Sequence, residues 1–149
     1  MPDDATARHS LPNLYVGQAQ KEITHNEALA RIDALLYPVV EAELALPPTG
    51  LTSSSDGLCW LIGSAAIGQW EGRTGQIARW SDGSWRYISP VEGMTVWLVS
   101  GSKRLFYIGG DWNSPSAINS PVGGAVIDLE ARAAIEAILG HLRQISNIP

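Results

Sequence analysis

The residues whose types and spacing would support catalysis are few, and the first of them is a Glu-x-x-His pair. Glu22 and His25 stand three residues apart in a segment without Gly or Pro, so that on a helix they share one face. This spacing is half of a di-iron carboxylate site, which requires a second Glu-x-x-His motif and two further Glu residues. The sequence contains no second such motif. We therefore interpret Glu22 and His25 as part of a solvated helix face.

The single cysteine and the carboxylates also form no recognisable catalytic arrangement. Cys59 lies within the apolar run 58–62, where a buried and unreactive thiol is the expected state. Motifs of serine hydrolases, zinc proteases and P-loop proteins are absent from the sequence. We therefore expect a protein that is not an enzyme and that needs no cofactor or metal. The central acidic residues stand beside Gly or in turns, where backbone hydrogen bonding explains them: Asp56, Glu71, Asp82, Glu92 and Asp111.

Tryptophan is unusually frequent, and all six Trp lie between residues 60 and 112. A single ring most often fills a core, but six rings exceed what a small sheet obviously requires. We therefore expect one or two of the rings to face outward, toward a glycan or a neighbouring subunit. The candidates are Trp70, Trp80, Trp85 and Trp112.

The composition indicates a folded protein with little surface charge. Charged residues make up 17% of the 149 residues, against about 25% in a typical domain, which favours a surface buried against other subunits. The net charge is −5 and the longest basic run is Lys103-Arg104, so we expect no nucleic-acid partner. No apolar run approaches about 18 residues, and the first ten residues are polar. We therefore expect neither membrane insertion nor a signal peptide.

Hydrophobic periodicity predicts an α+β fold. It consists of an N-terminal amphipathic helix, a central antiparallel β-meander of about five to six short strands, and a C-terminal helix. Residues 1–13 lack periodicity and are expected to form a flexible or partner-docked arm. Residues 14–112 are expected to form the helix-plus-meander domain, and residues 113–125 a linker.

Within the domain, apolar residues at three- and four-residue steps predict a helix over residues 18–36. We expect this helix to pack over the meander, or on an oligomer axis, through Ile23, Leu29, Ile32 and Leu36. The dipeptide Asp82-Gly83 predicts a tight hairpin turn that pairs Trp80 with Trp85. An extended stretch is expected at 39–46, and strands are predicted at 58–62, 75–80, 84–88, 94–99 and 104–108.

The last segment, residues 126–149, is expected to be a packing or oligomerisation helix that covers 128–146. Five apolar residues repeat there every 3.5 residues and define a seam: Ala131, Ile135, Ile138, Leu142 and Ile145. The seam either packs on its own domain or joins copies of the chain. In the second case, Leu at one heptad position and Ile at the other favour a homotrimer or a higher oligomer.

A long motif near the N-terminus resembles the opening of a domain family of unknown function that recurs in phage and gene-transfer-agent structural proteins. The motif is Gly17-Gln-Ala-Gln-Lys-Glu-Ile-Thr-His-Asn-Glu-Ala28, within the matching segment 11–29. Residues 66–80 and Pro90-Val-Glu-Gly-Met94 also fit. The resemblance covers roughly residues 11–112.

Members of this family occur in tail-fibre, host-specificity and head-spike proteins. The resemblance therefore implies a structural component of a phage or gene-transfer-agent particle, acting as the base or adaptor of a head spike or tail fibre. It implies capsid, spike or fibre subunits as partners, and no catalytic residues. Such a protein would be made in the host cytoplasm, reside in the virion and leave by lysis. The alternative is a carbohydrate-binding module that contacts host capsule or lipopolysaccharide through exposed Trp.

Overall fold

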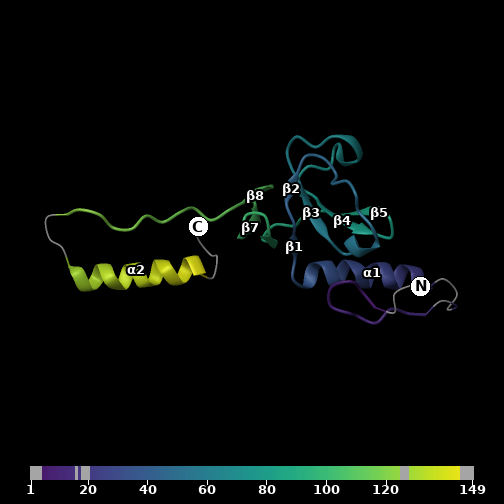
Figure 1. Ribbon diagram of the computed structural model, residues 1–149, viewed down its shortest axis with the longest axis horizontal. Helices are drawn as coiled ribbons and strands as arrows, with labels where there is room; N and C mark the ends of the chain where they lie inside the picture. The colour runs from purple at the N-terminus through teal and green to yellow at the C-terminus, as the bar shows by residue number, and fades with distance from the viewer. Residues whose placement is uncertain (1–4, 16, 18–20, 125–127, 145–149) are drawn as a thin grey trace.

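The computed structural model describes residues 5–15, 17, 21–124 and 128–144. Two helices flank a series of short strands along the chain (Figure 1). The helices are α1 (Lys21–Leu36) and α2 (Leu129–Gln144), with short 3-10 helices η1 (Ser53–Ser55) and η2 (Gly68–Trp70). The strands are β1 (Val39–Val40), β2 (Glu43–Leu44), β3 (Cys59–Ile62), β4 (Ile77–Ser81), β5 (Ser84–Ile88), β6 (Thr95–Leu98), β7 (Lys103–Ile108) and β8 (Asp111–Asn113).

The strands form two mixed sheets of four strands each, in the orders β1-β6-β7-β8 and β2-β3-β4-β5. The α+β class and the order of helix, strands and helix are confirmed. Each sheet consists of an antiparallel meander plus one short strand that pairs in parallel, β1 with β6 and β2 with β3. These two short strands lie within residues 39–46, which were expected to be extended but were not predicted to pair with other strands.

The predicted hairpin is confirmed. Asp82 and Gly83 both have positive φ, 48° and 72°, as the tight turn requires. The turn places Trp80 directly opposite Trp85 on β4 and β5. Their ring centroids lie 4.9 Å apart in an edge-to-face arrangement. A local sequence signal therefore fixed the register of this pair of strands.

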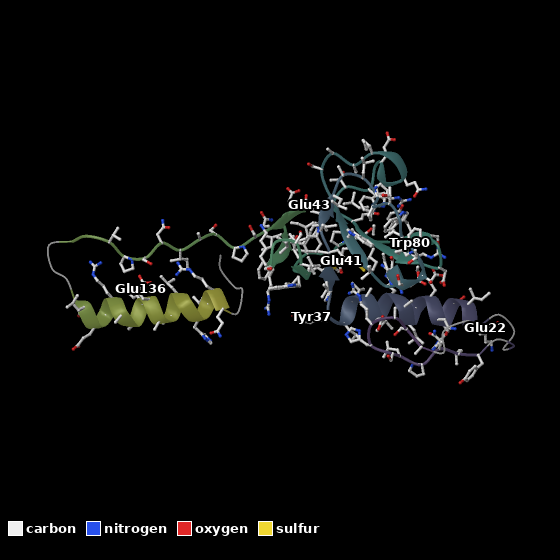
Figure 2. The ribbon with its side chains drawn as sticks, in the orientation of Figure 1. Glu22, Tyr37, Glu41, Glu43, Trp80 and Glu136 are labelled. Atoms are coloured by element: carbon white, nitrogen blue, oxygen red, sulfur yellow. The ribbon has the colours of Figure 1, made fainter. Side chains whose placement is uncertain are left out.

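The segment that carries β1 and β2 links the two sheets (Figure 2, where Glu41 and Glu43 are labelled). On one side the backbone N–H of Val99 donates to the carbonyl of Val40 at 2.9 Å. On the other side the N–H of Glu41 donates to the carbonyl of Cys59 at 2.8 Å. The chain thus leaves the first sheet and enters the second within a few residues.

Two separate cores lie on opposite faces of the β2–β5 sheet, because alternate residues of a strand point to opposite sides. The first core is mainly aliphatic and includes residues of both sheets and of α1. The second core is rich in tryptophan and is covered by the chain around η2. The buried members are Ala34, Val40, Cys59, Leu61, Ile77, Ile88, Val96, Leu98 and Leu105 in the first core, and Trp60, Ile62, Trp70 and Ala78 in the second.

The face of α1 that packs within the chain is not the predicted one. Asp33 and Ala34 are buried, at 0% and 3% exposure, and Glu22 joins them on this face. The expected packing residues are instead exposed or half-buried: Ile23 is 64% exposed, Ile32 48% and Leu36 57%, while Leu29 is half-buried. The reason is that α1 buries a carboxylate which binds another segment of the chain. Packing of the apolar face on an oligomer axis stays a prediction.

That segment is the N-terminal arm, residues 5–14, which lies beside α1 (Figure 1). The backbone N–H groups of Arg8 and His9 donate to the two carboxylate oxygens of Asp33 at 2.9 and 2.8 Å. The Arg8 side chain donates to the carbonyls of Gly57 and Val39. The expected arm therefore docks on its own chain, because Asp33 supplies the acceptors that its backbone needs.

The C-terminal part of the chain is set apart from the sheets (Figure 1). An extended strap, residues 114–124, runs along α2. Two arginines of α2 donate to carbonyls of the strap: Arg132 to Pro121 and Gly123, and Arg143 to Ile118. We call residues 5–113 the body and residues 114–144 the strap–helix unit.

Candidate functional site

Three of the four candidate tryptophans belong to one cluster on the outer face of the β2–β5 sheet. Trp85 lies at its centre, with ring centroids 5.5, 5.1 and 4.9 Å from those of Trp60, Trp70 and Trp80. Trp70 is fully buried, so its ring cannot present a face to a glycan or to a second subunit. Trp80 and Trp85 are half-buried. This cluster is the second core of the body.

Trp112 lies at a different place, on the edge strand β8. Its ring nitrogen donates to the carbonyl of Gly75 at 2.8 Å, and its ring meets Tyr107 edge-on at 5.2 Å. The first contact joins β8 to the loop before β4, and the second lies within the sheet β1-β6-β7-β8. Trp112 is half-buried, and none of the six tryptophans is an exposed residue. All six rings therefore pack, at least in part, against other residues of the chain.

The predicted seam lies on α2, at the surface. Ile135 and Ile138 are 42% and 60% exposed, Ala131 is exposed and Leu142 is half-buried. Ile145 lies outside the described residues. The neighbouring Leu139 is the one buried residue among those described on α2, at 4% exposure. In the part of the chain that the structure describes, α2 lies apart from the sheets (Figure 1), and three seam residues, Ala131, Ile135 and Ile138, are exposed.

A groove of about 870 Å³ separates α1 and the arm from strands β4 and β5. Charged side chains of both signs line it: Arg31, Arg79, Arg86, Glu27, Asp56 and Asp82. Arg79 and Arg86 stand directly opposite each other on β4 and β5. The groove was not predicted from the sequence, because its residues come from three distant segments.

Arg79 is the unusual member of this lining. Its side chain is only 5% exposed, and its Nε is buried without a hydrogen-bond partner. Arg86 approaches Glu27 at 3.7 Å, but both of these side chains are more than half exposed. Asp56 accepts from the backbone N–H of Asp82 at 3.0 Å. Within the described chain, no acidic group forms an ion pair with Arg79.

Two buried titratable groups complete the electrostatics of the body. Burial raises the pKa of the Cys59 thiol, in spite of Arg8 and Arg79 nearby, so the thiol is a poor nucleophile. Burial alone would raise the pKa of Asp33, but hydrogen bonds from Thr6, Arg8 and His9 outweigh it and hold that pKa below its ordinary value. Asp33 is thus a charged anchor for the arm.

The described residues contain no cluster of three His, Cys, Asp or Glu side chains able to hold a metal ion. None of the described helices combines the length and apolar character of a membrane-spanning segment. On α1, His25 is exposed, but Glu22 is buried at 9% exposure, so the prediction of a solvated helix face is wrong for Glu22.

Comparison with known proteins gives a match that ends where the body ends, at residue 113, and that begins within α1. No curated protein matches the sequence significantly. A family model described as "Protein of unknown function (DUF2793)" matches residues 25–113, which cover α1 from its second turn and all eight strands. The match ends where the strap begins, so it does not include the strap–helix unit. Because it spans more than half of the chain, this protein belongs to the DUF2793 family.

Proposed function

We propose that this protein is a structural subunit of a phage or gene-transfer-agent particle, the base or adaptor of a head spike or tail fibre. In this proposal the body is the family module and α2 joins copies of the chain, with a trimer favoured. Capsid, spike or fibre subunits are the further partners, and the protein resides in the virion. The resemblance of the segment 11–29 to domains of such particles supports this assignment.

The main support for assembly through α2 is the exposure of apolar residues on this helix. A helix of 16 residues is marginal in water unless an apolar face is covered by other groups. Its N-terminal Leu129 is 75% exposed and the seam residue Ile138 60%, although the neighbouring Leu139 is buried. The uncovered seam repeats at the spacing of a coiled coil. A second copy of the same helix supplies the matching surface.

The test is the mass of the purified chain and of two single variants. The wild type should be an oligomer by light scattering at micromolar concentration. Ile138→Asp places a carboxylate on the seam of every subunit and should yield monomers, because burial of an unpaired charge costs several kcal/mol. Ala137→Asp is the control, since it adds the same charge at an exposed position off the seam and should leave the oligomer intact. A monomeric wild type, or dissociation by both variants, would contradict the proposal.

The particle assignment has its own test. Mass spectrometry of purified phage-like particles from the encoding cell should detect the chain in a fixed ratio to the capsid protein. Its absence from particles that are otherwise complete would overturn the assignment without affecting the oligomer. The alternative role, glycan binding through exposed Trp, has less support, because all six Trp are buried or half-buried.

A further inference from the structure

The groove contains an arginine whose position the fold alone does not explain. A buried guanidinium that lacks acceptors is unfavourable, since it loses water without gaining hydrogen bonds. Arg79 is in this state at its Nε. In addition, like charges placed directly opposite on neighbouring strands repel each other, and Arg79 faces Arg86 in this way. An anion between the two guanidinium groups offsets both the repulsion between them and the uncompensated charge of Arg79.

We propose that the groove binds a small carboxylic acid that carries several hydroxyl groups, such as a uronic acid residue. Its carboxylate lies between Arg79 and Arg86. A planar guanidinium presents paired N–H donors that match the two oxygens of a carboxylate, so a single ligand group offsets the uncompensated charge of Arg79. The volume of about 870 Å³ lies in the range of small-molecule sites. This proposal is independent of the assembly through α2.

The remaining lining selects among anions. Three carboxylates, Glu27, Asp56 and Asp82, balance the three arginines of the groove. They repel a polyanion such as an acidic peptide or a nucleic acid, but they accept hydrogen bonds from hydroxyl groups. Tyr15 also lines the groove, and its ring, 71% exposed, offers an apolar face for a sugar ring. One carboxylate together with several hydroxyls therefore fits the lining best.

Titration calorimetry with the full chain tests the ligand class. Galacturonate and glucuronate should bind, whereas the neutral sugars galactose and glucose should bind at least about tenfold more weakly, because the charge-assisted hydrogen bonds are missing. Equal binding of neutral sugars would overturn the role of the carboxylate. Tighter binding of an Asp-rich peptide would overturn the sugar-acid class. No binding of either uronate at millimolar concentration would overturn the proposal as a whole.

Variants locate the binding site. Arg79→Met keeps the length of the side chain and removes the buried charge, so it should weaken uronate binding about tenfold to hundredfold. It should leave the melting temperature unchanged or higher, whereas a purely structural role of Arg79 predicts a lower one. Arg86→Met changes a largely exposed side chain and should weaken binding without affecting the fold. Unchanged binding in both variants would overturn the proposal.

One further substitution controls for general loss of positive charge. Arg104→Met is the matched control, because Arg104 lies on β7 in the other sheet and does not line the groove. It should bind uronate like the wild type.

Discussion

The body and the strap–helix unit bury their side chains in different ways. The body contains two cores on opposite faces of one sheet and anchors its own N-terminal arm through a fully buried carboxylate. The strap–helix unit buries one leucine among its described helical residues and holds its strap by arginines that bind backbone carbonyls. The body buries its core side chains within one chain. The strap–helix unit leaves apolar residues of α2 exposed, among them Ile135 and Ile138.

The largest effect that separates the two regions is expected in the tryptophan core. Trp70→Ala removes the largest fully buried side chain and leaves a cavity next to Trp85. It should destabilise the body by about 3–5 kcal/mol, which chemical denaturation followed by Trp fluorescence measures. The oligomer should persist wherever the body still folds. A loss below about 1 kcal/mol would show that the loop around η2 is not part of the core.

A matched pair of leucines compares the regions directly. Leu61 and Leu139 are buried to similar extents, at 1% and 4% exposure, one in the body and one on α2. Leu61→Ala should lower the free energy of unfolding of the body by about 2–5 kcal/mol. Leu139→Ala should leave that value unchanged and increase amide hydrogen exchange only within the strap–helix unit. Equal effects on the body would show that the two regions unfold as one.

The docked arm provides a smaller effect that depends on pH. Asp33→Asn replaces a carboxylate that binds the N–H groups of Arg8 and His9, and it should destabilise the body by about 1–3 kcal/mol at neutral pH. The pKa of Asp33 is lower in the folded than in the unfolded state, where it has its ordinary value of 3.8. The contribution of Asp33 to the free energy of unfolding is therefore complete above pH 3.8 and disappears as the pH falls through the pKa of the folded state. The difference between wild type and variant should therefore shrink in acid. A difference that grows there would contradict the role of the carboxylate.

The smallest effect is expected on the outer face of α1. Ile32→Ala shortens a side chain that is 48% exposed, so it should change the stability of an isolated chain by less than about 0.5 kcal/mol. If the oligomer instead dissociates in this variant, the α1 face belongs to the assembly axis together with α2. Light scattering on the same samples distinguishes these results.

The sequence predicted the elements whose signals are local. The Asp82-Gly83 turn fixed the hairpin because glycine tolerates positive φ, and the neighbouring tryptophans followed from the register. The ends of most strands agree to within one or two residues for the same reason. The split into two sheets was not predicted, because the parallel strands β1 and β2 are only two residues long and have no pattern of their own.

The candidate site, the groove, could not be predicted from hydrophobic periodicity. A pattern search places apolar residues inside, but α1 buries Asp33 and exposes Ile23, since the partner of that face is a polar backbone. Arg79 follows Ile77 and Ala78 in a buried strand and carries no signal of a site by itself. Its role depends on Arg86 across the strand and on α1 more than 40 residues earlier, which only the folded chain brings together.

The link between the sheets also predicts where the chain tolerates insertions and deletions. Glu41 and Ala42 separate β1 from β2, and the backbone on either side is paired with a different sheet. One residue added or removed here shifts the register in one of the sheets and turns its side chains to the other face. Between residues 114 and 124 the same change only alters the length of the strap. Related sequences should therefore vary in length after residue 113 and keep a constant length between Val39 and Leu44.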